Sequence, residues 1–299
     1  RPEPATPYVP EDYLLESTLL PYEEALQGSA VNNSYDTLSV PTYLTQVKEF
    51  YFIVDCYHNQ VIYHDNLEDP LYEWKVMTSD LSMGHTLASD GIVYLIDDTE
   101  NNRILVMERA IGADGEALFV PTQEFTGIGN RRRCQVLRSV PFFCSCQAAN
   151  FYVWSSLSGE MYLFRRGAEG TRLYLTEIRS IPSLDGVYVR SFTIAGDEIY
   201  FVSGNSSILL ADLSTFEIKK EYPVPPELAG MIQLTPIEDY YYITVSTDAT
   251  GNQDYATMIP AFDHGGNTDR KGMQEGRLFH SCNRRNGNWK YHHQQCRYG

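Results

Sequence analysis

Five residues are spaced as if they occupied one structural position that recurs along the chain. Each lies eleven residues before an equivalent point in a repeated strand pattern, and they are Tyr43, His85, Phe143, Ser191 and Gln233. Four of them carry a polar group, and Arg190 stands next to Ser191. Such groups, gathered at one place, would bind a small polar or anionic ligand. The competing interpretation is that they are ordinary solvated loop ends.

These residue types lack what hydrolytic chemistry needs. The set contains no carboxylate that could act as an acid, a base or a metal ligand. The chain has no Gly-x-Ser-x-Gly nucleophile elbow and no glycine-rich phosphate loop. We therefore predict no catalytic residue and no resident metal or cofactor at these positions.

Two other segments have compositions that could bind a metal ion. His280, Cys282 and the pair His292-His293 could hold a transition metal. The segment from Asp248 to Asp254 has the composition of a calcium loop, but Ile259 stands where such a loop needs a bidentate glutamate. We expect that segment to be a long hairpin loop.

The polar turn from Asp97 to Arg103 allows two interpretations. In the functional one, Asp97 and Arg103 form an ion pair within a site. In the structural one, Asp97 and Asn101 hydrogen-bond to the turn backbone while the stem of Arg103 packs between neighbouring sheets. We favour the structural interpretation.

Short strands joined by polar turns must position all of these residues. From Val93 to Glu108 an apolar run passes through a polar turn into a second apolar run, which predicts two antiparallel strands. The pattern recurs at spacings of 42, 58, 48 and 42 residues, around Val54, Ile96, Trp154, Val202 and Thr244. Repeats of this length with several short strands are typical of propeller blades. We expect an all-β β-propeller with five blades visible in the sequence and six in total.

A family resemblance supports this architecture. The segment Asp97-Asp98-Thr99-Glu100-Asn101-Asn102-Arg103-Ile104-Leu105-Val106 resembles the core of an NHL repeat, and residues 55–62 are a looser match. The resemblance implies a six-bladed propeller. Proteins of this kind mostly serve as binding platforms, whereas some related propellers are lactonases, hydrolases or lyases that hold a divalent cation such as calcium.

The chain is not uniform along its length. Residues 1–40 are rich in proline and predict an exposed leader or linker, and residues 41–299 are expected to form the propeller. Two segments, 131–146 and 264–299, depart from the strand pattern. They are either basic surface insertions or the product of a shifted reading frame, and a sixth blade would need the second of them.

Composition and charge exclude some functions. The formal net charge is -16, which opposes binding to nucleic-acid phosphates. No apolar run approaches the roughly 20 residues that a membrane-spanning helix needs. The six cysteines show no paired Cys-x-x-Cys spacing, so a structural zinc site is not indicated, and Cys56 is expected to be an inert, half-buried thiol. The first residue is not methionine, which fits a processed, extracytoplasmic or cell-surface form.

These observations predict a non-catalytic, monomeric binding propeller. Its partner would be a small polar molecule or another protein, bound at the channel mouth by Tyr43, His85, Arg190, Ser191 and Gln233. The alternative function is a metal-dependent hydrolase or lactonase of the gluconolactonase type, which would hold a divalent cation.

Overall fold

The computed structural model describes residues 15–21, 28–128, 142–147, 150–156, 158–168, 170–184, 186–203, 207–224, 231–237, 240–245 and 257–263. The chain divides into two compact units, Arg1–Asp185 and Gly186–Gly299. Strands dominate both units. The described residues contain no α-helix but include three short 3-10 helices, which are η2 (Cys56–His58), η3 (Leu71–Glu73) and η4 (Pro182–Leu184).

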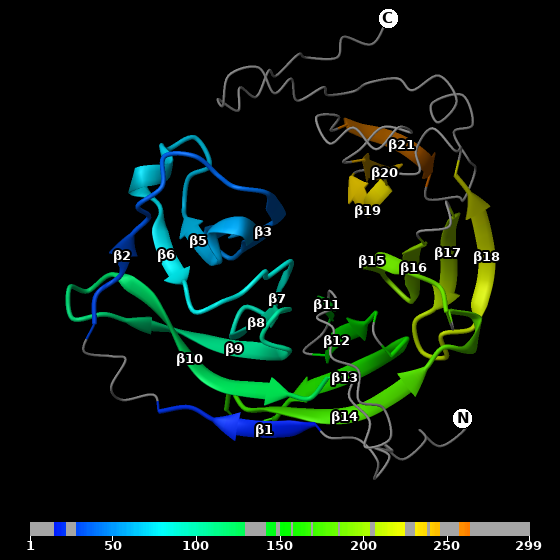
Figure 1. Ribbon diagram of the computed structural model, residues 1–299, viewed down its shortest axis with the longest axis horizontal. Coiled ribbons are helices and arrows are strands. Elements are labelled where there is room, and N and C mark those ends of the chain that lie inside the picture. The colour runs from blue at the N-terminus through cyan, green and yellow to red at the C-terminus, as the bar shows by residue number, and fades with distance from the viewer. Residues whose placement is uncertain are drawn as a thin grey trace, which may run out of the picture. The chain divides into compact units, whose positions relative to one another are not determined.

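The first unit contains three antiparallel sheets, with strand orders β2-β6-β5-β4-β3, β1-β10-β9-β8-β7 and β11-β12-β13-β14 (Figure 1). The strands are β1 (Glu16–Leu19), β2 (Val31–Asn32), β3 (Pro41–Val47), β4 (Phe50–Asp55), β5 (Gln60–His64), β6 (Lys75–Thr78), β7 (Leu87–Ser89), β8 (Val93–Asp98), β9 (Arg103–Ile111), β10 (Ala117–Thr126), β11 (Phe142–Gln147), β12 (Asn150–Ser155), β13 (Glu160–Arg166) and β14 (Leu173–Ser180). Each sheet has a core of four strands that pair in chain order, which is the construction of a propeller blade.

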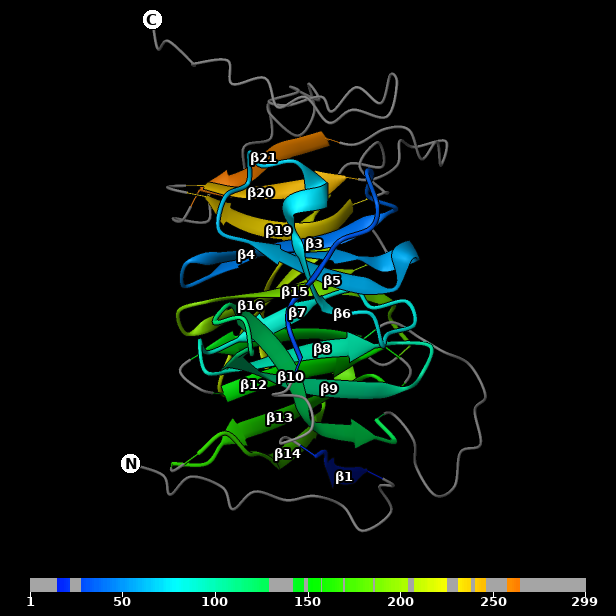
Figure 2. The same ribbon diagram turned by 90° about the vertical axis from the view of Figure 1, so that its left-hand side faces the viewer.

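The second unit contains two further sheets, with strand orders β15-β16-β17-β18 and β19-β20-β21. Their strands are β15 (Val189–Ala195), β16 (Glu198–Ser203), β17 (Ser207–Asp212), β18 (Ile218–Pro223), β19 (Met231–Ile237), β20 (Tyr240–Val245) and β21 (Thr257–Asp263). Figure 2 shows β19, β20 and β21 as successive strands of one sheet. Each of the five predicted repeats therefore corresponds to one sheet, whereas residues 264–299 lie outside the described residues.

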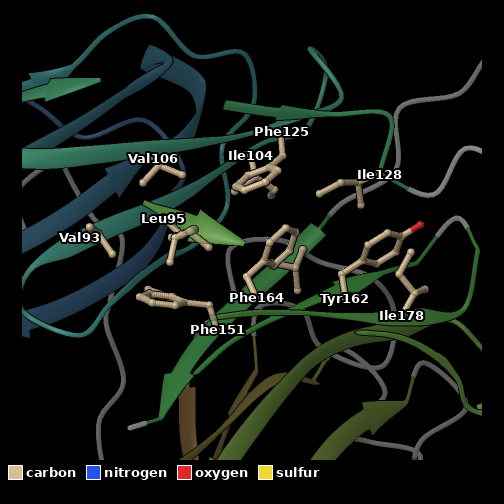
Figure 3. Close-up of a cluster of buried hydrophobic side chains, with 13 residues drawn as sticks. Val93, Leu95, Ile104, Val106, Phe125, Ile128, Phe151, Tyr162, Phe164 and Ile178 are labelled. Atoms are coloured by element: carbon tan, nitrogen blue, oxygen red, sulfur yellow. The ribbon is translucent and has the colours of Figure 1, made fainter. Parts of the chain in front are cut away.

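Strand β8 shows why the apolar runs are continuous. Val93 and Leu95 belong to a buried cluster shared with strands β12 and β13 of the third sheet, and Figure 3 shows this cluster. Tyr94 and Ile96 belong to another cluster, shared with strands β4 and β5 of the first sheet. Successive side chains of a strand point to opposite faces, so sheets that are covered on both faces need apolar residues at every position.

Strand pairing confirms most of the predicted register. Counting back eleven residues leads to the observed backbone partner in four of the five repeats: Tyr43↔Val54, Phe143↔Trp154, Ser191↔Val202 and Gln233↔Thr244. In three of these pairs the inner strand carries an extra residue just before the pair, so the bulge recurs at the same place in the first, fourth and fifth sheets.

The equivalence predicted for His85 is wrong. Leu87 pairs with Ile96, and His85 lies two residues before β7 begins. Asp98↔Arg103 and Asp55↔Gln60 are the end pairs of their two hairpins, so Asp98 corresponds to Asp55. Ile96 therefore lies one residue before the equivalent of Val54, and counting back eleven residues from it misses the partner.

Two short strands lie within the segment that the sequence predicts to be a leader. Strand β1 pairs antiparallel with β10, and β2 pairs antiparallel with β6, so each extends a four-stranded blade at its outer edge. In Figure 1, β1 is the blue strand at the periphery. Pairing of this kind covers exposed backbone donors and acceptors that would otherwise invite association with other chains. The domain boundary at residue 41 stays a prediction.

Candidate functional site

The ends of β4 and β8 carry buried carboxylates that fasten the loops before the innermost strands. Asp97 is fully buried, and its Oδ2 accepts a hydrogen bond from the His85 amide at 3.0 Å. Its Oδ1 accepts hydrogen bonds from both the amide and the hydroxyl of Thr86, and Thr99 Oγ1 donates to Oδ2 at 3.1 Å. A carboxylate with this many donors is held in place by the fold and is not available to a substrate.

Asp55 has the same role in the first sheet. Its Oδ1 accepts the Ser39 amide at 2.7 Å, and its Oδ2 lies 2.7 Å from His58 Nδ1 and 3.2 Å from Gln60 Nε2. The Gln60 amide also donates to Asn33 Oδ1 at 3.0 Å. These buried bonds tie the segment before β3 to the β4–β5 turn.

Arg103 forms an ion pair with Asp98, not with Asp97 as the functional interpretation of this turn proposed. Its Nε donates to Asp98 Oδ2 at 2.6 Å, and its terminal nitrogens reach Asp80 at 2.9 Å and Glu124 at 3.1 Å. Burial alone would lower the pKa of Arg103, but hydrogen bonds to Asp98 and Asp80 outweigh it and the pKa is raised. The turn is therefore structural, as the favoured interpretation predicted, but Asn101 donates to the Asp98 carboxylate and not to the turn backbone.

His85 is a partly exposed titratable group at this end of the first unit. Its side chain is 22% exposed, and its Nδ1 lies 3.2 Å from Thr99 Oγ1 and 3.6 Å from Asp97 Oδ2. Burial alone would lower the pKa of His85, but the hydrogen bond to Asp97 and the Asp97 charge outweigh it, so the pKa is raised above its usual 6.5. His85 therefore keeps its positive charge to a higher pH than a free histidine does.

Tyr43 lies on the neighbouring inner strand. It is partly buried and packs against the apolar cluster between the first two sheets. The Thr42 hydroxyl lies 3.5 Å from the Gly84 carbonyl, which brings the start of β3 next to the residues before β7. The structure thus brings Tyr43 and His85 to adjacent strand starts.

Cys56 is more completely buried than the half-buried thiol that the sequence predicted. It is a free cysteine with 1% exposure. Burial raises the pKa of Cys56 to about 11, and the nearby charges of Asp97 and Asp55 act in the same direction. A thiol with so little thiolate at neutral pH is a poor nucleophile.

The second unit holds the three remaining predicted residues. Ser191 is buried in β15, and its hydroxyl donates to the Ile232 carbonyl at 2.6 Å. Gln233 lies half-buried in β19, next to that carbonyl in the chain. Arg190 is the bulged residue of β15; its guanidinium carbon lies 5.8 Å from the Tyr188 ring centre, and its Nε is buried without a hydrogen-bond partner. Ser191 and Gln233 thus lie on adjacent strands.

Metal-ligating residues gather at one place among the described residues. The side-chain ligand atoms of His64, Asp65 and Asp69 lie within 4.8 Å of one another. However, His64 Nδ1 already accepts the Asn66 amide at 3.0 Å, and the side chain of Asp65 is 68% exposed. The cluster is a solvated turn. The segment 248–254, His280, Cys282 and His292-His293 all lie outside the described residues.

Sequence reasoning missed two exposed tyrosines, Tyr35 and Tyr57, at the same end of the first sheet. Tyr57 is 58% exposed and Tyr35 is 40% exposed. Tyr35 lies in the segment expected to be a leader, and Tyr57 follows a cysteine in a tight turn, so neither belongs to a repeat position. No pattern in the sequence could have distinguished them from tyrosines that are buried between sheets.

Comparisons with known proteins define the class of the fold. No protein-family profile and no curated protein matches the chain. Its structure is similar to that of a streptogramin B lyase, with a TM-score of 0.50 and 14% identity over 86% of this chain and 73% of that chain. It is also similar to the structure of a candidate 6-phosphogluconolactonase from Bacteroides uniformis, with a TM-score of 0.54 and 13% identity over 79% of this chain and 71% of that chain.

The chain is therefore an all-β protein of the β-propeller class. At identities this low the similarity concerns the fold and not the activity. Among the described residues, no helix has the length and apolar character needed to cross a bilayer.

Proposed function

We propose that the chain is a non-catalytic recognition propeller of the NHL type. It binds a small polar molecule or another protein at the end of the blades where the innermost strands begin. The blade count of six and the monomeric state belong to the same proposal, and the protein needs no cofactor.

One observation carries this proposal. Three carboxylates lie at the ends of β4 and β8 in the first two blades, and these three, Asp55, Asp97 and Asp98, are fully buried. Each accepts at least one backbone amide, from Ser39 for Asp55 and from Ser82 for Asp98, while Asp97 accepts two. Acid–base catalysis and cation binding both need carboxylate oxygens that can reach a ligand. Oxygens that are already saturated by the fold support recognition over chemistry.

The proposed contacts are the residues that remain reachable at the strand starts. In the first unit these are His85 and Tyr43, which are both partly exposed. In the second unit they are Arg190 and Gln233, while Ser191 is buried and its hydroxyl already donates to the Ile232 carbonyl. The imidazolium of His85 and the guanidinium of Arg190 favour a ligand that carries hydrogen-bond acceptors.

The alternative is a metal-dependent hydrolase or lactonase, and the names of the two similar structures, a lyase and a candidate lactonase, make it worth testing directly. The purified chain is assayed with gluconolactone and 6-phosphogluconolactone, with calcium or magnesium and, as control, after chelation with EDTA. We expect hydrolysis at the rate of buffer alone. Acceleration that depends on the metal would contradict the proposal and establish the enzyme.

Binding is tested in the same preparation by calorimetry with gluconate and 6-phosphogluconate as probes. His85→Ala and Arg190→Ala are each expected to weaken retention of the anionic probe. Leu44→Ala, an exposed residue of β3 away from the strand start, is the matched control. Equal binding by all three variants would remove these residues from the site.

A further inference from the structure

We propose that four loops of the first unit form a docking surface for an arginine-bearing segment of a partner protein. The loops are residues 33–40, 56–59, 79–86 and 99–102, and they are called the loop surface here. This inference rests on the proposed recognition function and names the chemistry of its partner.

The loop surface is continuous because hydrogen bonds join each loop to the next. The Tyr57 amide donates to the Ser39 carbonyl at 3.0 Å, the Met83 amide donates to Asn59 Oδ1 at 3.0 Å, and the Glu100 amide donates to the Ser82 carbonyl at 3.1 Å. All three involve backbone amides, so they fix the course of the chain and not merely its side chains. The loops therefore present one preorganised face that changes little on binding.

Exposed aromatic side chains distinguish this face. Tyr57 is 58% exposed and Tyr35 is 40% exposed. The Tyr35 ring stacks on His58 with a centroid separation of 3.6 Å and an angle of 7°, and His58 is held by Asp55 at 2.7 Å. A tyrosine that is fixed before binding loses little conformational freedom when a partner arrives, which is the property of an interface anchor.

Val40 adds an exposed apolar group to this surface. It is 46% exposed and adopts a φ of 52°. A β-branched residue is strained in this left-handed region, where glycine or asparagine fits without cost. Nearly half of this valine's surface remains open to contact with a partner.

The charge on the loop surface selects the partner. Asp36, Asp80 and Glu100 are exposed, and the four loops contain no lysine or arginine. The nearby Arg103 is shared among three carboxylates. By contrast, Lys48 and Arg109 lie at the opposite end of the same two blades, in the β3–β4 turn and near the end of β9.

A face of tyrosines rimmed by carboxylates suits arginine. The guanidinium group stacks on an aromatic ring and forms paired hydrogen bonds with a carboxylate, and it is less strongly hydrated than the lysine ammonium. A peptide segment with spaced arginines could engage Tyr35 and Tyr57 together while its charges meet Asp36 and Glu100.

The experiment measures binding of a fluorescein-labelled peptide of alternating arginine and glycine by fluorescence polarisation. We expect Tyr57→Ala and Tyr35→Ala each to weaken binding about tenfold. Tyr174→Ala is the matched control, because Tyr174 is 50% exposed on β14 and lies outside the loop surface. The same peptide with citrulline in place of arginine should bind at least tenfold more weakly than the arginine peptide, since it keeps the shape and loses the charge.

Three outcomes would overturn the inference. These are unchanged affinity of Tyr57→Ala, an equal loss in Tyr174→Ala, or equal binding of the citrulline peptide. If a tyrosine variant loses its native circular dichroism, Asp36→Asn combined with Glu100→Gln tests the same face and should also weaken binding. Metal-dependent lactone hydrolysis would refute the proposed function. If the chain does not hydrolyse lactones but Tyr57→Ala binds the peptide as tightly as the native chain, only this inference is refuted.

Discussion

The first two blades of the first unit and the β15–β18 blade of the second unit are held together by different hydrogen-bonding groups. Buried polar residues end the second strand of the blade in both, and they are Asp55, or Asp97 with Asp98, in the first two blades but Ser203 in the later one. Asp97 collects two backbone amides and two hydroxyls. In the second unit, the hydroxyls of Ser191 and Thr193 bond across to the carbonyls of Ile232 and Leu234 instead.

This difference shows that the strand pattern does not determine which side chains hold the loops and strands of a blade in place. A loop that turns two amides inward needs an acceptor with several lone pairs, which a carboxylate supplies. A neighbouring strand that offers carbonyls needs donors, and hydroxyls are sufficient. The first two blades therefore depend on buried charge, and the β15–β18 blade depends on neutral hydrogen bonds at the equivalent place.

The largest expected effect on stability follows from replacing one of these buried side chains. Asp97→Ser should lower the free energy of unfolding by about 3 kcal/mol or more, because it leaves buried amides without acceptors. Ser203→Ala, the matched change in the second unit, should cost about 1 kcal/mol. Urea unfolding followed by circular dichroism measures both, and an equal cost for the two variants would contradict the contrast drawn between the units.

A second prediction concerns the link between the second and third sheets. Gln123 is buried, and its side-chain amide pairs with both the carbonyl and the amide of Leu173, at 2.9 and 3.0 Å. Gln123→Met keeps the shape but loses both bonds, so we expect a loss of about 2 kcal/mol in the free energy of unfolding. The exposed Gln46→Met is the control. A neutral result at Gln123 would show that the amide bridge adds nothing to packing.

The hydroxyl links of the second unit should matter less. Ser191→Ala and Thr193→Val each remove one hydrogen bond to a carbonyl and should each cost about 1 kcal/mol. Because the two residues lie on one strand and bond to one neighbouring strand, a double-mutant cycle tests whether their effects couple. If either variant lowers the free energy of unfolding more than Asp97→Ser does, the contrast between the blades is contradicted.

The smallest expected effect depends on pH. The pKa of His85 is raised in the folded protein, so its charged form stabilises the fold below the unfolded pKa of about 6.5, and this stabilisation is lost as the pH rises through the folded value. The free energy of unfolding of the native chain should exceed that of His85→Gln by less than about 1 kcal/mol near pH 6, and the two should be equal at alkaline pH. The test is a thermal-melting series over pH with both proteins, and a gain that grows with pH would contradict the assignment.

Much of the fold could be predicted because its information is local. Apolar runs that alternate with polar turns predicted the strands, and a constant interval of eleven residues predicted the correct partner for Tyr43, Phe143, Ser191 and Gln233. The interval failed for His85, because Ile96 lies one residue before the position that Val54 occupies in the first sheet. Counting along the chain predicts the register only when the reference residues are equivalent in the structure.

The candidate site was less predictable because its contacts join distant segments. The pairing of Arg103 with Asp98 instead of Asp97 depends on which side of β8 faces Glu124 and Asp80. The exposure of Tyr57 depends on the path of residues 33–40, which no repeat specifies. In both cases residues of the same chemical type have different contacts or exposure because their surroundings in the fold differ.

The sequence by itself determined that this protein is built of repeated small sheets, where their strands lie and that its surface is acidic, because strand periodicity and charge are properties of short stretches. The tertiary structure alone decided which carboxylates are saturated by backbone amides and which tyrosines remain in water. Those outcomes depend on hydrogen bonds and burial between segments that are far apart in the chain, and no short stretch of sequence contains both partners.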